Sequence, residues 1–420
     1  MEEAELLSAD PLTDEEGRAA DVTATMGVEL LEAAEGGHAD AMRALLEHPA
    51  AVAGAMLMHS RKCDGFTALI VAGKNGHADA MRVLLDHPAA EAAAMLIHTS
   101  SHGSTALMYA AQQGHVDAMR VLLDHPSADP AMMIRAANNE TTVTTLMYAA
   151  MDGHVEAIRV LLDHPSADPQ SMMMVVDSRN GCTAFLYAAL DGHADAMHML
   201  LDHPASDAAA MLMHADSDGD NALMLVALQN GRVDTMRLLL NHSSADAAAM
   251  MMQTGSIGDT ALMLAARFGH MDAMRLLLDH PAADVAAMLA VHTVAGTGCV
   301  SALLSAAKFA AKGSTDRMDT PSTSAVQTLS RDCAPLLLLL RRVAVDPSFD
   351  QQLHMTMVMS AMCDAPHSRK LLDDDQPDAV RDECVRLLLL HGARFDSGNP
   401  VMVRVGRELA SWAWRFAGSG

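Results

Sequence analysis

Apolar residues along this chain fall into short runs with helical spacing, and the runs come in pairs. Residues 105–123 show one such pair, in which the first run ends at Gly114 and the second begins just after it. Apolar residues three and four positions apart give a helix one apolar stripe, and here they are Leu107, Ala110 and Ala111, then Met119, Leu122 and Leu123. Nearly the same sequence recurs at residues 144–169 and 183–207, so the chain repeats a pair of helices.

The ends of each predicted helix carry residues that suit helix termini. Thr105 can cap the first helix with its hydroxyl group, and Gly114 can adopt the left-handed conformation that ends it. The second helix runs from about Val116 to Asp124, and Pro126 ends it because the residue before a proline avoids helical angles. A helical hairpin of this kind cannot bury both faces alone, so we expect the copies to stack.

A Gly-His pair at the end of each first helix sets the repeat length. Successive pairs are separated by 38 or 39 residues, and a fixed period in this range is typical of stacked arrays. The pairs are Gly37-His38, Gly76-His77, Gly114-His115, Gly153-His154, Gly192-His193 and Gly269-His270, with Gly231-Arg232 as a variant.

These residues give the chain a clear resemblance to the ankyrin repeat family. The family's T-P-L-H-x-A-A-x-x-G-H corresponds to T-A-L-M-Y-A-A-Q-Q-G-H at residues 105–115, and its following Leu-Leu to Leu122-Leu123. Residues 27–47 resemble a starting unit and residues 385–396 a closing one, so the resemblance covers roughly 22–396. The resemblance implies an all-α, ankyrin-like solenoid of stacked helix-turn-helix repeats. Each repeat is about five or six residues longer than the family's 33.

The additional residues follow the second helix and predict a short extra helix in each repeat connection. In "ADPAMMIR" (128–135), Asp129 suits an N-cap and Pro130 the first helical turn. We expect the methionines of this helix to pack on the neighbouring repeat, and an exposed methionine surface is the alternative. Solvent exposure distinguishes the two at Met132, Met172, Met211 and Met250.

The pattern divides the chain into four predicted segments. Residues 1–21 form an acidic disordered leader and 22–300 seven regular repeats, followed by two degenerate repeats over 301–396 and an amphipathic capping helix over 397–420. The degenerate repeats carry inserted loops at about 314–330 and 367–380. The stripe of the last helix is Val405, Leu409, Trp412 and Phe416, and its alternatives are a partner-binding peptide or a membrane-surface anchor.

Charge and cysteine usage restrict the class of partner and the compartment. Acidic residues outnumber basic ones 53 to 28, which argues against nucleic acid and favours a protein partner of basic character. Six scattered cysteines without a C-x-x-C pair indicate reduced thiols, so we expect a cytoplasmic protein. No apolar stretch reaches the 18 residues of a spanning helix. We expect a monomer, with a peripheral membrane tether through the tryptophan-bearing tail as the alternative function.

No residue pattern predicts catalysis, a metal site or a cofactor. The 22 histidines recur with the repeat, and those of one repeat lie about 15 Å apart along a helix, too far for one ion. We therefore expect each imidazole to bond the backbone of a connecting turn. The nucleophile, phosphate-loop, zinc-protease and dinucleotide motifs are absent from the sequence, so the chain is predicted not to be an enzyme.

The predicted partner-binding residues follow from the repeat alignment. In ankyrin-like stacks the first helices line the concave side, where partners bind, and tyrosine occupies one equivalent position in three consecutive repeats only. The alternative is that tyrosine is tolerated where leucine also packs. With the next exposed positions, the predicted site is Tyr109, Tyr148, Tyr187, Gln112, Gln113, Met151, Asp152, Leu190, Asp191, Arg267 and Phe268. The sequence thus predicts a non-catalytic scaffold or adaptor.

Overall fold

A computed structural model describes residues 11–48, 53–229, 232–256, 258–268, 270–284, 288, 292–294 and 298–300. The described chain forms two compact units, divided after Asp207. The predicted degenerate repeats over 301–396, their loops and the capping helix over 397–420 lie outside the described residues. So do residues 1–10 of the predicted leader.

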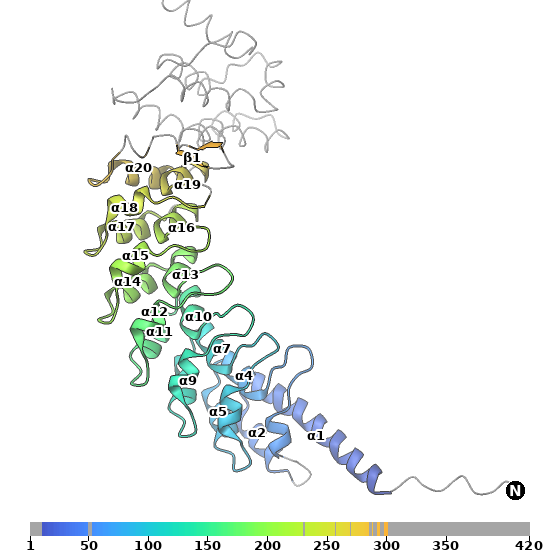
Figure 1. Cartoon of the computed structure of the whole chain (residues 1–420). Coiled ribbons are helices and arrows are strands. Elements are labelled where there is room, and N and C mark those ends of the chain that lie inside the picture. The colour runs from blue at the N-terminus through green and yellow to red at the C-terminus, as the bar shows by residue number, and fades with distance from the viewer. Residues whose placement is uncertain are drawn as a thin grey trace, which may run out of the picture. The chain divides into compact units, whose positions relative to one another are not determined.

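The first unit stacks five helical hairpins, as Figure 1 shows for residues 11–207. Each first helix packs on the first helix of the next hairpin, and each second helix does the same. The first helices are α1 (Pro11–Glu35), α4 (Ala68–Lys74), α7 (Ala106–Gln112), α10 (Thr145–Met151) and α13 (Ala184–Asp191). The second helices are α2 (Ala39–Leu46), α5 (Ala78–Leu85), α8 (Val116–Leu123), α11 (Val155–Leu162) and α14 (Ala194–Asp202).

The helices begin and end at the residues that the sequence predicted. The Thr105 hydroxyl accepts a hydrogen bond from the backbone N–H of Met108 at 3.4 Å, and Thr67, Thr144 and Thr183 cap their helices in the same way. Gly114, which ends α7, has a φ of 70°. Side chains with almost no solvent exposure, such as Leu107 and Leu122, fill the space between repeats.

The third helices are the predicted extra ones: α3 (Ala53–Leu57), α6 (Ala92–Ile97), α9 (Pro130–Arg135) and α12 (Pro169–Met173). Asp129 caps α9 by accepting a hydrogen bond from Met132 N at 3.1 Å, and Pro130 occupies the first turn. The packing interpretation of the methionines holds at Met172, Met211 and Met250, which are buried. Met132 is 47% exposed because it stands one position earlier in its helix than the other three, where Ser171 stands in α12.

Helix α1 differs from the predicted organisation of the N-terminus. It begins at Pro11, whereas the sequence predicted a disordered leader up to residue 21. Proline suits the first turn of a helix, and the following residues are rich in Glu, Ala and Arg, which have high helix propensity. The acidic composition that suggested disorder therefore forms the first half of a 25-residue helix.

The second unit repeats the same plan. Its helices are α15 (Ala208–Met213), α16 (Ala222–Leu228), α17 (Val233–Asn241), α18 (Ala247–Met252), α19 (Ala261–Phe268) and α20 (Met271–Asp279). Helix α16 packs on α19 and α17 on α20, while the third helix α18 contacts both α17 and α19. An antiparallel pair, β1 (His292–Val294) and β2 (Gly298–Val300), follows, with Thr293 opposite Cys299.

The turns before α4, α7, α10 and α16 each carry one antiparallel bridge, whereas β1 and β2 carry three paired positions. We call residues 60–67, 99–105, 137–144 and 176–183 the finger turns of the first unit. The bridges join Ser60 to Thr67, Thr99 to Thr105, Ala137 to Thr144, and, in the second unit, Ala215 to Asn221. The short strands are thus an extended form of a repeat feature, and the architecture is the predicted helical solenoid.

Candidate functional site

The first helices and finger turns of the first unit form one surface, which we call the inner face. Figure 1 shows α4, α7, α10 and α13 in one column, with the loops that precede them projecting on that side. Two rows of exposed or partly exposed residues lie at the C-terminal ends of the first helices. The first row is Glu35, Lys74, Gln112, Met151 and Leu190, and the second is Gly36, Asn75, Gln113, Asp152 and Asp191.

Tyr109 and Tyr148 are half-buried and connect the first helices to the finger turns. The Tyr109 hydroxyl lies 3.2 Å from Ser100 Oγ in its own finger turn. The Tyr148 hydroxyl accepts a hydrogen bond from Asn138 Nδ2 at 3.0 Å and lies 3.2 Å from Ser104 Oγ of the preceding repeat. Both rings therefore help to hold the turns against the helices, and part of each ring faces solvent.

Tyr187 differs from the other two tyrosines because it is only 6% exposed. Burial, together with the charge of the neighbouring Asp177, raises the pKa of the Tyr187 hydroxyl to about 12. Asp177, itself 1% exposed, organises the finger turn of the fifth repeat. Its carboxylate accepts hydrogen bonds from the backbone N–H groups of Cys182, Arg179 and Asn180 at 2.7, 3.0 and 2.9 Å. Tyr187 thus packs against this turn and offers little surface to a partner.

The remaining predicted residues of the first unit lie at the ends of the first helices. Gln113, Asp152 and Asp191 are exposed. Gln112, Met151 and Leu190 are partly exposed. The structure therefore brings these six side chains onto one face of consecutive helices, beside Tyr109 and Tyr148.

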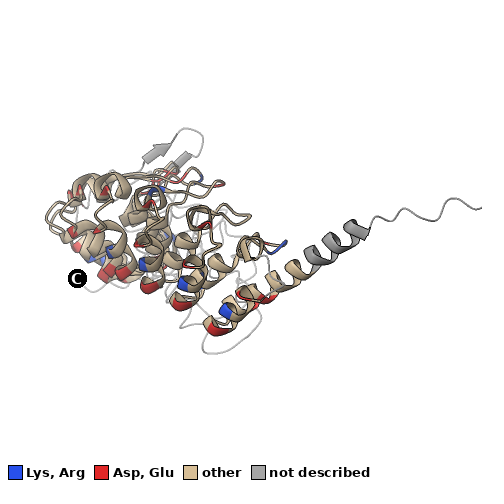
Figure 2. Cartoon of the chain, turned by 90° about the horizontal axis from the view of Figure 1, so that it is seen from below, with Lys and Arg blue, Asp and Glu red and all other residues tan. Residues whose placement is uncertain are grey.

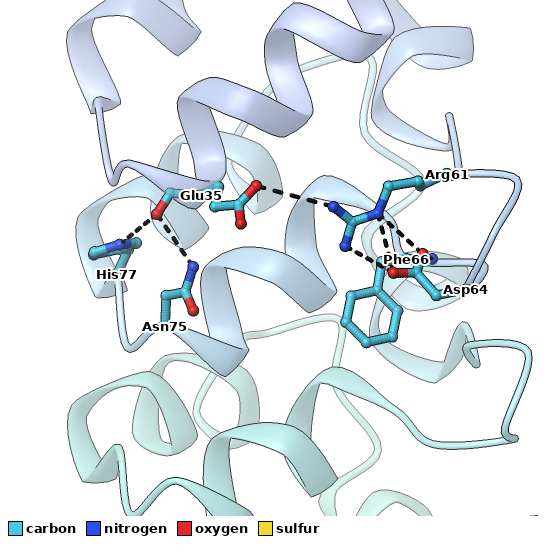
Figure 3. A network of polar contacts seen from close by, with 6 residues as sticks. All are labelled: Glu35, Arg61, Asp64, Phe66, Asn75 and His77. Carbon is cyan, nitrogen blue, oxygen red and sulfur yellow. Dashed lines mark hydrogen bonds and ion pairs between the residues drawn. The ribbon is translucent and has the colours of Figure 1, made fainter.

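A cluster of cations and aromatic rings lies at the second repeat, and of its members only Tyr109 was among the predicted site residues. The Arg61 guanidinium and the Lys74 ammonium lie 5.5 and 5.4 Å from the centre of the Phe66 ring, which is 5.0 Å from the Tyr109 ring. Figure 3 shows Arg61 between Asp64 and Glu35. Its Nη2 is 2.7 Å from the Asp64 carboxylate, and its Nη1 is 3.9 Å from that of Glu35. The aromatic residue just before the capping Thr67 was the available sequence signal.

The charges of this cluster hold each other in place. The hydrogen bond to Asp64 raises the pKa of Arg61 above its ordinary value. Burial raises the pKa of Asp64, but the hydrogen bonds from Arg61 and from Phe66 N outweigh it and keep that pKa below its usual range. Both groups are therefore charged at neutral pH, with the guanidinium fixed over the aromatic ring.

The recurring Gly-His pair couples neighbouring repeats. His77 Nε2 donates to the carbonyl oxygen of Glu35 at 3.1 Å, and Asn75 Nδ2 donates to the same oxygen at 3.1 Å (Figure 3). The His77 ring lies where a Cβ on Gly37 would be, 2.6 Å from its Nδ1. Burial lowers the pKa of the equivalent His115 below its ordinary value. His77 thus bonds a backbone carbonyl, as the sequence predicted, and the lowered pKa of His115 favours the neutral form of that imidazole at neutral pH.

The second recurring histidine closes the turn after each second helix. The His125 ring accepts a hydrogen bond at Nδ1 from Ser127 N at 3.1 Å, and its Nε2 lies 3.8 Å from Asp86 of the preceding repeat. Five more repeats have the Nδ1 contact, at His87, His164, His203, His242 and His280. Within the described chain, no three His, Cys, Asp or Glu side chains are arranged to hold a metal ion.

The two predicted residues of the second unit lie at the end of α19. Arg267 forms an ion pair with Asp259, which is 1% exposed. Phe268 is 45% exposed, and its ring is stacked 6.3 Å from that of His270. Arg267 is thus engaged with the preceding turn, while Phe268 is available at the surface.

The turn before α16 gathers carboxylates in the second unit. Burial and the charges of Asp216, Asp218 and Asp259, which outweigh that of Arg267, raise the pKa of Asp220 to about 6. Burial also raises the pKa of Asp216. Asp216 Oδ1 accepts hydrogen bonds from the backbone N–H groups of Asp218 and Asp220, both at 2.9 Å, so the turn holds these like charges together.

Asp220→Asn should therefore stabilise the fold by about 1 kcal/mol at pH 7.5, because it removes a repelled charge that solvent only partly screens. The folded pKa of about 6 lies above the unfolded value of 3.8, so ionisation costs stability as the pH rises through this window. Below about pH 3 the carboxyl is mostly protonated in both states, and the difference should vanish. Urea unfolding at both pH values measures it, with Asp124→Asn, an exposed aspartate at the end of α8 and outside this cluster, as control. A stability difference that does not change with pH would contradict this assignment.

The second helices present a different surface, on which charges are paired within one helix. Figure 2 shows basic and acidic residues next to one another in successive helices. In the first unit the pairs are Asp40 with Arg43, Asp79 with Arg82, Asp117 with Arg120, and Glu156 with Arg159. Exposed pairs of this kind contribute a few tenths of a kcal/mol each. Each of these four helices also ends at an exposed acidic residue, so this outer face keeps an excess of negative charge.

Comparison with known protein families gives one match to this architecture. The model described as "Ankyrin repeats (3 copies)" matches residues 30–134, 131–211 and 205–288, and together these cover more than half of the 420 residues. The chain belongs to the ankyrin-repeat family, as predicted. No curated protein matches it.

The family match carries a general functional meaning. Ankyrin repeats generally mediate binding between proteins, and proteins built from them are typically interaction modules without catalytic activity. Within the described residues, no helix has both the length and the apolar character needed to cross a membrane.

Proposed function

We propose that this protein is a non-catalytic scaffold or adaptor that binds a protein partner on its inner face. The observation that carries the proposal is the contrast between the two faces of the first unit. The arginines of the outer face are already paired within each helix. On the inner face, the side chains of Gln113, Asp152 and Met151 form no ion pair or hydrogen bond within the described residues. Buried side chains hold the helices that carry them in place.

The proposed binding surface consists of Tyr109, Tyr148, Gln112, Gln113, Met151, Asp152, Leu190 and Asp191. Tyrosine is well suited to recognition because its ring is rigid and its hydroxyl is polar. The hydrogen bonds of Tyr109 and Tyr148 fix their rings before a partner arrives, which lowers the entropy lost on binding. Tyr187 supports this surface from beneath, and in the second unit Phe268 stands at the position equivalent to Asp191.

The net charge of −25 favours a partner that is basic over at least part of its surface. The six scattered cysteines without a C-x-x-C pair favour action in the reducing cytoplasm. We propose that the chain acts there as a monomer.

The test is affinity capture on the full chain, followed by mass spectrometry. Met151→Lys/Leu190→Lys places two charges on the inner face and should reduce capture of the specific partner at least tenfold, since two central contacts are lost. The matched control is Val116→Lys/Val155→Lys, which places the same two charges at the starts of α8 and α11. Equal capture by both variants would contradict binding on the inner face. Circular dichroism of each variant checks that the fold is retained.

A further inference from the structure

The inner face of the first unit changes its chemistry along the stack. Its first row begins with Glu35, whose carboxylate is paired with Arg61, and passes from Lys74 in the second repeat through Gln112 to Met151 and Leu190. Its second row passes from Asn75 and Gln113 to Asp152 and Asp191. One end is therefore basic and polar, and the other end is apolar with carboxylates at its edge.

The basic end is unusual in so acidic a chain. Lys62 and Lys74 are the two lysines of the described residues, and both lie in the second repeat. Both side chains are exposed, and within the described structure neither ammonium has an ion pair. Lys74 lies over the Phe66 ring, which holds its position without neutralising its charge.

Arg61 adds to this end a cation of fixed orientation. Its ion pair with Asp64 and its place over Phe66 keep the guanidinium at the edge of the inner face. The carboxylates of Asp64 and Glu35 balance the Arg61 charge. The positive charges left for a partner are therefore those of Lys62 and Lys74. The half-buried Tyr109 ring, 5.0 Å from Phe66, continues this surface toward the third repeat.

We infer that the partner binds in one direction along this face, with an acidic end at Lys62 and Lys74 and an apolar, basic end at Met151–Asp152 and Leu190–Asp191. The inference rests on the proposed function and specifies the partner's chemistry. Successive first helices are separated by about 8–10 Å, so the rows from Lys74 to Leu190 cover three such steps. An extended segment of roughly eight to ten residues has the required length.

Charge complementarity gives this direction rather than the reverse. A segment placed the other way would bring its carboxylates to Asp152 and Asp191 and its cations to Lys74, and like charges brought together disfavour binding. A reversed segment would place its carboxylates near Arg179, the exposed cation on the finger turn of the fifth repeat. Its backbone N–H is bound to Asp177, and its exposed side chain makes it the right comparison.

The experiment selects peptides from a random library displayed on phage against the full chain and measures their affinities by fluorescence anisotropy. Selected peptides should contain Asp or Glu at one end, and Lys62→Glu/Lys74→Glu should weaken their binding at least tenfold. Replacing the peptide's acidic residues with Lys should restore binding to that variant. The matched control, Arg82→Glu/Arg120→Glu, makes the same charge change on the outer face and should leave affinity within about twofold.

Three other results would overturn the inference. Peptides that depend on Met151 and Leu190 but show no acidic requirement would contradict the direction and leave the inner face as the binding surface. Acidic peptides that respond to Arg179→Glu instead of the lysine variant would show the opposite direction. If no selected peptide responds to any of these inner-face substitutions, including Met151→Lys/Leu190→Lys, the proposed function fails together with the inference.

Discussion

Replacing Gly76 with alanine should lower the free energy of unfolding by about 3 kcal/mol, through two separate effects. Gly76 has a φ of 75°, a conformation that costs a residue with a Cβ about 1–2 kcal/mol. The new Cβ would also lie 2.6 Å from Nδ1 of His115, an imidazole of the next repeat. That ring must move, and the close packing around it adds a cost of similar size.

The two effects can be separated with a double-mutant cycle. His115→Ala opens space for the new methyl group, so Gly76→Ala/His115→Ala should cost less than the sum of the single changes. Gly54→Ala is the matched control, because Gly54 lies within α3 and the nearest atom to its added Cβ is 3.6 Å away. That variant should be neutral or slightly stabilising. Guanidinium unfolding followed by circular dichroism measures all four proteins, and simple additivity in the cycle would rule out the proposed contact.

The second large effect is expected at the finger turn of the fifth repeat. Asp177→Ala should destabilise the fold by about 3 kcal/mol, because it leaves three backbone N–H groups without their acceptor, among them that of the buried Cys182. Asp177→Asn is the matched control that the chain itself provides. In the fourth repeat, Asn138 occupies the equivalent position, and its Oδ1 accepts hydrogen bonds from Thr141 N at 2.9 Å and Val143 N at 3.2 Å. Asparagine should therefore retain most of the stability.

Thermal unfolding of the two Asp177 variants tests this assignment. The tyrosine titration gives a second measurement on the same proteins. Loss of the Asp177 charge should lower the pKa of Tyr187 from about 12, although burial keeps it above the ordinary value of 10.0. Equal destabilisation by alanine and asparagine would show that the carboxylate charge, rather than the acceptor geometry, holds the turn.

Local chemistry in the sequence was sufficient to predict the helices and their ends. Thr105, Gly114 and the Asp129-Pro130 pair act within a few residues of themselves, and each has the role that its residue type predicts. The acidic start of the chain was misjudged because composition alone does not separate a charged helix from a disordered leader. Pro11 was the available signal for the helix start.

The arrangement of the inner face depends on contacts between repeats, which periodicity does not describe. The repeat pattern places Tyr109, Tyr148 and Tyr187 at one equivalent position, yet their exposure differs with the turn each one meets. Tyr187 is buried against Asp177, whereas Tyr148 contacts Asn138 and Ser104. The cluster around Phe66 was missed for the same reason, because its members come from a turn and two helices.

The contact between each Gly-His glycine and the next histidine limits how this protein can change in length. A deletion of a few residues within a repeat would move the imidazole away from the site that the previous glycine leaves open. A duplication of one complete unit of 38 or 39 residues would instead create a new glycine and a new histidine in the correct places. The array can therefore gain or lose whole units by gene duplication or by engineering, and each gain would lengthen the surface available for recognition by one step.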